Sequence, residues 1–162
     1  MVCANASGSH SLPLFVIGKS KEPRCFKNVS CLLSLYKAQK SAWMNSALFS
    51  EWYFKDFILN VKKLRKREGK TGKALLILNN APCHPPVRIL NAIDDDFSVM
   101  YLPPSITALV QPRDQGVIEK LKRIYRKQVL RRLLLAKNYE KSVAAFAENL
   151  NMKGACYMLA ET

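Results

Sequence analysis

Three polar side chains, Asn79, Asn80 and His84, directly follow the apolar run Ala74–Leu78. That run is too short for a helix and does not alternate, so it predicts a strand covered on both faces, as in a parallel sheet. In open α/β sheets, functional groups gather beyond the carboxyl ends of such strands, and Pro85–Pro86 prevents any continuation here. The imidazole could act near a phosphate or hydrogen-bond its own loop, and the second role is favoured. Taken alone, this segment favours an Asn-rich turn whose amides satisfy loose backbone groups.

A second polar group lies in Tyr101–Ile118, which reads YLPPSITALVQPRDQGVI. A short strand over Val99–Leu102 and a proline-pinned loop are predicted there, followed by Asp114 immediately before an amphipathic helix. From the residues alone, Asp114 suits the N-cap of that helix. The acidic triplet Asp94–Asp96 falls between a short helical stretch after Pro86 and the strand, where a solvated turn is favoured over a metal site.

Two motifs, NNAPCHP (Asn79–Pro85) and QPRDQG (Gln111–Gly116), together resemble the DDE superfamily endonuclease domain of pogo and Tigger-type transposases. The jerky and centromere protein B families belong to the same group. Residues 3–27 (CANASGSHSLPLFVIGKSKEPRCFK) and 42–52 (AWMNSALFSEW) also look like this family. The resemblance implies an α/β, RNase H-like fold, with a mixed five-stranded sheet flanked by helices, in a single domain over residues 1–162.

The catalytic positions of that family are changed in this sequence. The resemblance places the family's second catalytic Asp at Asn79, a neutral amide, and its third at Asp114. The first catalytic Asp belongs to a central strand upstream of Cys3, where only Met1 and Val2 stand. We therefore expect an N-terminally truncated domain that lacks this first strand. Its unpaired sheet edges could join related transposase-like proteins.

Metal chemistry is not expected from the residues that remain. The family uses Mg²⁺ or Mn²⁺, which are hard ions held by oxygen ligands, and two-metal phosphoryl transfer needs several anionic ligands. Asp114 keeps an inherited metal position, but we expect no bound cofactor and no catalysis. The alternatives are a residual nuclease that combines Asp114 with Asp56 or Asp94–Asp96, and a protein-interaction module or translated remnant. The family's separate helix-turn-helix domains are not expected here, so sequence-specific DNA recognition is not expected either.

Positive charge is concentrated in two segments of a chain whose net charge is +14. Residues 61–90 and 116–137 each hold eight cationic side chains against one acid, a net charge of +7 apiece. Such faces bind nucleic-acid phosphates without base specificity. The partner expected from them is therefore DNA, bound non-specifically. The expected contacts are Lys62, Lys63, Arg65, Lys66, Arg67, Lys120, Lys122, Arg123, Arg126, Lys127, Arg131 and Arg132.

Two helices should carry these cations. The first is predicted from about Asn45 to Arg67, with a core-facing stripe. Its basic run KKLRKR could be a nuclear localisation signal, which favours the nucleus, or a solvated helix end. The second helix is predicted from Asp114 to about Lys137, and a final amphipathic helix over Tyr139–Met152. The stripe of the first helix is Phe54, Phe57, Ile58, Val61 and Leu64, and the seam of the second is Ile118, Leu121, Tyr125, Val129 and Leu133.

Composition is that of a globular chain, with 49% hydrophobic and 23% charged residues. No apolar run approaches the roughly 18 residues of a membrane span, so no membrane association is expected. The cysteines are scattered and odd in number, without a Cys-x-x-Cys pair, and only His10 and His84 could join them. They are expected to be reduced thiols and not a disulfide framework or a zinc site.

Overall fold

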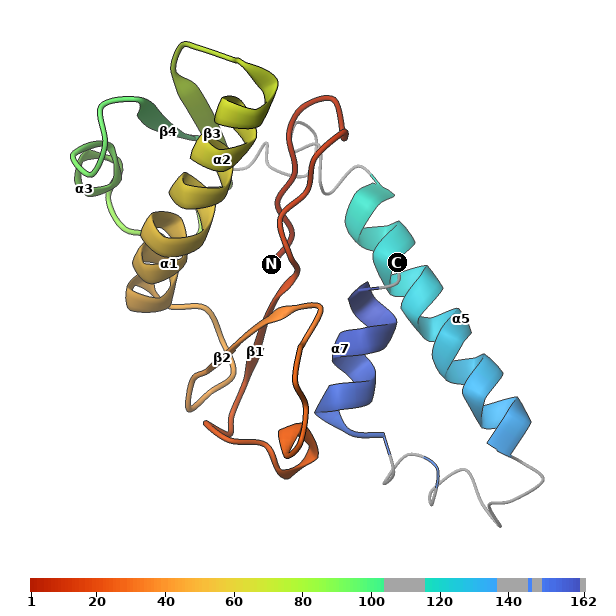
Figure 1. The fold of residues 1–162 in the computed structure, drawn as a ribbon. Helices are drawn as coiled ribbons and strands as arrows, with labels where there is room; N and C mark the ends of the chain where they lie inside the picture. The colour runs from red at the N-terminus through yellow and green to blue at the C-terminus, as the bar shows by residue number, and fades with distance from the viewer. Residues whose placement is uncertain (104–115, 137–145, 147–149, 161–162) are drawn as a thin grey trace. The chain divides into compact units, whose positions relative to one another are not determined.

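The computed structural model describes residues 1–103, 116–136, 146 and 150–160 (Figure 1). Helices and strands are mixed, so the fold is α/β, as the sequence predicted. The chain divides into two compact units: residues 1–42 together with 116–162, and residues 43–115. Each unit holds one two-stranded sheet. No helix in the described part of the chain is both long and apolar enough to cross a bilayer.

In the unit formed by residues 1–42 and 116–162, strands β1 (Phe15–Gly18) and β2 (Leu35–Ala38) pair in parallel. A short 3-10 turn, η1 (Arg24–Phe26), lies between them. Phe15 on β1 is buried. Gly18 is required at the end of β1, because a Cβ at this position would collide with the Tyr36 hydroxyl on β2.

Two helices complete this unit, α5 (Ile118–Ala136) and α7 (Met152–Ala160), and they lie side by side (Figure 1). The predicted apolar seam of α5 is confirmed, since each of its five residues is partly buried. Cys156 and Met158 anchor α7 in the core. The Tyr157 hydroxyl donates a hydrogen bond of 2.8 Å to the Cys31 carbonyl.

A continuous helical segment opens the unit of residues 43–115, in three parts: α1 (Ser46–Trp52), η2 (Tyr53–Ile58) and α2 (Leu59–Glu68). The Asn45 side chain caps its start, because the carboxamide oxygen accepts a 2.9 Å bond from the Leu48 amide. Gly69 ends it with a φ of 62°, a left-handed conformation that glycine adopts without strain. The helix predicted from about Asn45 to Arg67 is therefore confirmed.

The middle part, η2, is a π-helix and not an α-helix, and it changes which side chains face the core. A π-helix joins residues five apart, so Tyr53 and Ile58 lie on the same side, and both are buried. Phe57 is also buried, but Phe54 is 54% exposed. The predicted stripe was thus wrong at Phe54, because it assumed 3.6 residues per turn throughout.

Strands β3 (Ala74–Leu78) and β4 (Phe97–Tyr101) pair in parallel, and α3 (Val87–Asn91) lies between them in sequence. These elements match the predicted strands and the short helical stretch after Pro86. Aromatic rings join the inner face of this sheet to the helical segment. The Phe57 ring meets Phe97 edge-on at 5.9 Å between centroids and stacks on Tyr53 at 5.5 Å.

The prediction that Ala74–Leu78 is covered on both faces is wrong. Leu76 is buried, but Leu75 is 56% and Ile77 is 47% exposed. The strand has a parallel partner, as expected, yet the face that carries Leu75 and Ile77 is exposed. The described strands form two separate parallel pairs, β1–β2 and β3–β4, and no five-stranded mixed sheet is seen among them.

The predicted final helix over Tyr139–Met152 falls mostly outside the described residues. Helix α7 begins at Met152, where that prediction ended, and it was not anticipated from the sequence.

Candidate functional site

The loop of residues 79–86 lies at the carboxyl end of the β3–β4 pair. Leu78 and Tyr101 are opposite each other in the register, so both strands end at the same edge. Asn79, Asn80 and His84 therefore occupy the position that the sequence predicted for a functional group. Asn79 is partly buried, and Asn80 is exposed.

His84 holds this loop in place. Its Nδ1 lies 3.0 Å from the Asn79 carbonyl oxygen. Because a carbonyl only accepts, we assign the proton to Nδ1. The imidazole ring packs on Phe49 at 4.5 Å and lies 5.8 Å from the Tyr101 ring, centroid to centroid. The favoured role, in which the ring hydrogen-bonds its own loop, is confirmed.

Two further hydrogen bonds fix the same loop. The Tyr101 hydroxyl donates to the Pro85 carbonyl. The Ser46 hydroxyl, at the start of α1, donates to the Cys83 carbonyl at 3.2 Å. A loop held by a strand, a helix and its own histidine is a rigid structural element.

His84 gives the loop a pH dependence. Burial lowers its pKa, and the hydrogen bond to the Asn79 carbonyl opposes part of that effect. The unfolded chain therefore takes up this proton first as the pH falls. The stability linked to His84 is fully present above the unfolded pKa of about 6.5 and is lost as the pH falls from there toward the folded pKa.

We accordingly expect the free energy of unfolding to decrease between pH 7.5 and pH 5 in the wild-type chain, and to decrease less in a His84→Phe variant. Urea denaturation at both pH values measures the difference. Equal pH dependence in the two proteins would show that His84 is not the titrating group.

The inherited metal position cannot be completed from the described residues. Asn79 offers a neutral carboxamide oxygen, which binds divalent ions more weakly than a carboxylate. Asp114 lies outside the described residues, so its N-cap and metal roles remain predictions. Elsewhere in the described ranges, no group of three or more His, Cys, Asp or Glu side chains is arranged to hold a metal ion. The residues that are described therefore do not fit the family's Mg²⁺ or Mn²⁺ pair.

The acidic triplet forms a turn between α3 and β4. Asp94 Oδ1 accepts a 3.1 Å bond from the Asp96 amide, and its Oδ2 lies 2.5 Å from Lys62 Nζ. The hydrogen bond from Lys62 is the main cause that lowers the pKa of Asp94. Asp95 and Asp96 are exposed. The solvated-turn interpretation is confirmed, with Asp94 in an ion pair.

The basic run on α2 is divided between structural and exposed cations. Lys62 pairs with Asp94 and lies over the Phe97 ring, and Arg65 donates to the Gly72 carbonyl. Arg67 lies 3.8 Å from Glu68. Lys63 and Lys66 are exposed, with no ion pair among the described residues. This run thus offers fewer free cations than its sequence suggests.

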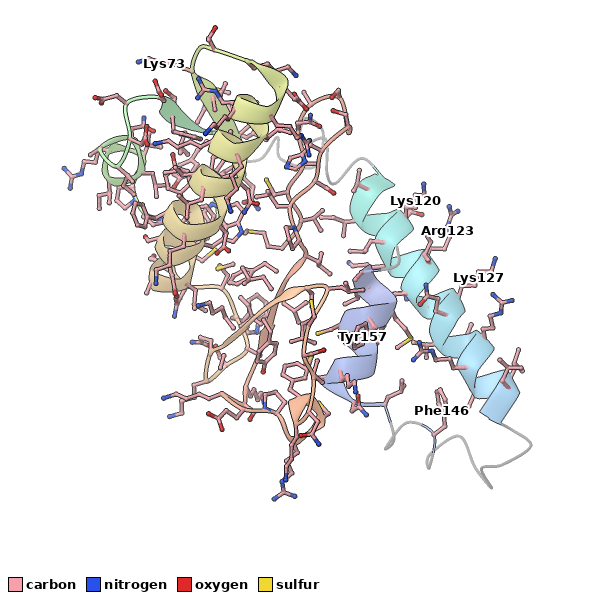
Figure 2. The ribbon with its side chains drawn as sticks, in the orientation of Figure 1. Lys73, Lys120, Arg123, Lys127, Phe146 and Tyr157 are labelled. Atoms are coloured by element: carbon pink, nitrogen blue, oxygen red, sulfur yellow. The ribbon has the colours of Figure 1, made fainter. Side chains whose placement is uncertain are left out.

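Helix α5 presents its cations more openly, since all seven predicted ones are exposed. Lys120, Arg123 and Lys127 are three and four positions apart, which places them in one row along the helix. Figure 2 shows these three side chains extending from the same side of α5, away from α7. Glu119 is the only acid on the helix.

The other cations of α5 surround this row. By helical spacing, Arg126 and Arg131 border it on either side. Arg132 lies on the side that faces α7. Its Nη1 is close to Gly154 of α7, at 3.7 Å from the point where a Cβ of that residue would lie. Lys122 is exposed nearer to the apolar seam. The seven predicted cations therefore fall into two groups. Five lie on or beside the outward row, and two, Lys122 and Arg132, lie near the side of α5 that packs against the rest of the unit.

The sequence interpretation missed the apolar groups that the structure leaves exposed. On α5, Leu130 is 58% and Leu134 is 69% exposed, at the carboxyl end of the cationic row. On the β3–β4 sheet, Leu75, Ile77 and Met100 are exposed. One sequence signal could have revealed the exposed residues of α5. Leu130 and Leu134 are four positions apart, and neither belongs to the apolar seam of the helix.

The structure is a mixed arrangement of helices and strands, with the loop of residues 79–86 at the carboxyl edge of one parallel pair. The chain belongs to the DDE superfamily endonuclease family, whose model matches residues 1–162. It is 38% identical to human Tigger transposable element-derived protein 7 over 130 residues, which is 77% of this chain and 24% of that protein. The resemblance drawn from the two motifs is therefore confirmed.

Two further relatives belong to the jerky group. The chain is 37% identical to the human Jerky protein homolog over 119 residues, 72% of this chain and 21% of that protein. It is 33% identical to mouse Jerky protein over 127 residues, 77% of this chain and 22% of that protein. The chain thus spans about a quarter of the length of the relatives it matches. No solved structure gives a significant match.

Proposed function

We propose that this transposase-derived domain no longer cleaves DNA and instead binds duplex DNA without sequence preference, in the nucleus. The observation that carries the proposal is the outward row of α5, Lys120, Arg123 and Lys127, with its bordering cations. All are exposed, and Glu119 is the only acid in the sequence of α5.

The dimensions of this row suit a phosphate backbone. Seven positions of an α-helix, from Lys120 to Lys127, span roughly 10 Å. One DNA strand carries a phosphate about every 3.4 Å along the axis, so the row can reach about three of them. Contacts of this kind fix no base sequence, because phosphates are the same at every step. The exposed Lys63 and Lys66 of α2 are a second, smaller source of phosphate contacts.

Loss of cleavage follows from Asn79. An amide at the second acidic position removes a full negative charge from a site that must hold two divalent cations close together. Of the two acidic positions that the motifs place within residues 1–162, only the one at Asp114 is a carboxylate. Membership of the family also supports an RNase H-like sheet.

A residual nuclease would need replacement carboxylates, and an ion pair argues against one of the two candidates, the triplet Asp94–Asp96. Asp94 is held by Lys62 Nζ at 2.5 Å. A metal ion there would have to displace that ammonium group, so the triplet is a poor partner for Asp114.

One plasmid experiment tests both halves of the proposal. The chain is mixed with supercoiled plasmid in Mn²⁺ at about 50 mM and about 200 mM salt, and the DNA is examined before and after protein removal. With about five phosphate contacts, we expect the affinity to fall several hundredfold between these conditions. After protein removal, the plasmid should remain supercoiled. An affinity that does not change with salt concentration would contradict binding through phosphate contacts. Nicking of the plasmid that disappears in an Asp114→Ala variant would contradict the loss of cleavage.

A further inference from the structure

A turn of residues 69–73 joins α2 to β3, and Thr71 lies at its centre. Gly69 and Gly72 stand on either side of Thr71, and both have positive φ angles, 62° and 97°. Apart from their neighbours in the chain, no described residue places a heavy atom within 4 Å of the point where a Cβ of either glycine would lie. The turn therefore has open space on both sides of Thr71.

Thr71 is exposed, and its hydroxyl makes no hydrogen bond with any other described residue. Ser41 gives a useful contrast, because it is also exposed and also follows a lysine. Its hydroxyl, however, donates a 2.6 Å hydrogen bond to Gln39 Oε1. A hydroxyl without a partner can enter the active site of another protein without losing a bond. Thr71 is thus the better placed of these two hydroxyls.

Two hydrogen bonds close the turn. The Lys70 amide donates to the Arg65 carbonyl at 3.0 Å, and the Arg65 guanidinium donates to the Gly72 carbonyl. Each bond involves an exposed residue of the turn, where bonds to water readily replace it. Thr71 and its neighbours can therefore extend into the groove of an enzyme while β3 and the core stay folded.

Lysines occupy positions on both sides of Thr71. Lys73, two positions after it, is exposed and extends from the end of the turn (Figure 2). Lys70, directly before it, has a side chain that is 68% exposed, and its Nζ lies 2.7 Å from Glu68 Oε2. An exposed ion pair of this kind contributes little, so Lys70 can exchange Glu68 for another carboxylate. The turn thus offers a free hydroxyl between two available cations.

From these features we propose that Thr71 is a phosphorylation site for a serine/threonine kinase that selects lysine on both sides of its acceptor. A kinase of this kind has acidic pockets for the two cations, and charge complementarity decides which hydroxyl it accepts. Thr71 Oγ1 attacks the γ-phosphorus of ATP and forms a new O–P bond, while the bond from that phosphorus to the β–γ bridging oxygen breaks. ADP leaves, and the hydroxyl proton passes to the catalytic aspartate of the kinase.

The phosphate would change the charge at the end of α2. It carries about −1.5 to −2 at pH 7, so the net charge of residues 61–90 would fall from +7 to about +5. Arg65, which already donates to the Gly72 carbonyl, and Lys73 are close enough in the turn to donate to the phosphate oxygens. The modification would therefore weaken the attraction of this helix end for other anions.

Mass spectrometry of the full chain tests the proposal. The chain is incubated with Mg²⁺, ATP and the catalytic fragment of protein kinase C, an enzyme that selects basic residues around its acceptor. Phosphate is then measured at each hydroxyl over time. We expect Thr71 to be modified about tenfold faster than Ser41. A Thr71→Ser variant should keep the modification at this position.

A Lys73→Gln variant tests the role of the flanking cations. Its Thr71 should be modified about fivefold more slowly than in the wild type, because one charge pair with the kinase is lost. Lys55→Gln is the matched control, since Lys55 is exposed, belongs to the same compact unit and carries the same charge. It should be modified at the wild-type rate. Far-ultraviolet circular dichroism checks that both variants are folded.

Any of three results would overturn the proposal. The first is a folded chain in which Thr71 stays unmodified, and the second is a Ser41 that is modified as fast as Thr71. The third is an equal rate at Thr71 in Lys73→Gln and in the wild type. None of these measurements includes DNA, so this proposal and the proposed function can fail separately.

Discussion

Phe57→Ala is expected to lower the free energy of unfolding by about 3–5 kcal/mol, whereas Phe54→Ala should change it by less than about 0.5 kcal/mol. The two residues are three positions apart in the same helical segment, and a regular α-helix would place both on its core-facing stripe. In the π-helical part η2, only Phe57 is buried, at 6% exposure, and Phe54 is 54% exposed.

The large cost at Phe57 comes from the contacts that its ring makes. The ring lies 5.5 Å from that of Tyr53, 5.7 Å from Trp52 and 5.9 Å from Phe97. Alanine would leave a cavity among three rigid rings, and rigid neighbours cannot close a cavity by small shifts. Phe97 lies on β4, so the cavity would also separate the helical segment from the sheet.

Urea denaturation, followed by tryptophan fluorescence, measures both changes. Trp52 is 2% exposed and lies within the same aromatic cluster, so its emission reports on this unit. Phe54→Ala is the matched control, with the same atoms removed from an exposed site. Equal losses in the two variants would mean that the segment is a regular α-helix.

Removing the outward row of α5 should give the second large effect, on DNA affinity. The triple variant Lys120→Gln, Arg123→Gln and Lys127→Gln loses up to three phosphate contacts. Each contact contributes about 0.9 to the slope of log affinity against log salt, so the slope should become shallower by about 2.7. Glutamine keeps the helix propensity close to that of the cations it replaces.

The control for this variant is the triple change Lys19→Gln, Lys21→Gln and Lys27→Gln. These three lysines are exposed and belong to the same compact unit as α5. Their loss changes the net charge by the same amount, without touching the row. Fluorescence anisotropy of a labelled duplex, titrated at several salt concentrations, gives both slopes. If the two triple variants lose the same slope, binding follows net charge and not the row on α5.

The spacing of apolar residues predicted the helices and strands that are defined by a local sequence pattern. The helix from Asn45, the helix of α5 and the strands β3 and β4 lie where apolar spacing and the prolines indicated. The position of Asn79, Asn80 and His84 at a carboxyl edge also followed from sequence, because parallel strands bring their ends together. Family membership rested on two motifs, and the family model confirmed it.

The sequence did not predict the features that depend on packing within the folded chain. The π-turn at η2 moved Phe54 out of the core, and a pattern based on 3.6 residues per turn contains no sign of it. The pairing of Lys62 with Asp94 joins α2 to a turn 32 positions later and removes one cation from a run that appeared free in the sequence. Helix α7 was missed because the stretch preceding it has helical spacing of its own.

The amino-acid sequence by itself determined the family of this chain, the amide at position 79 and the amount of positive charge, because residue identity alone decides those. Only the tertiary structure decided which cations face outward and which are in ion pairs. It also decided that Leu75 and Ile77 of β3 are exposed, since exposure depends on what the rest of the chain places against a residue, and neighbours in sequence do not report that.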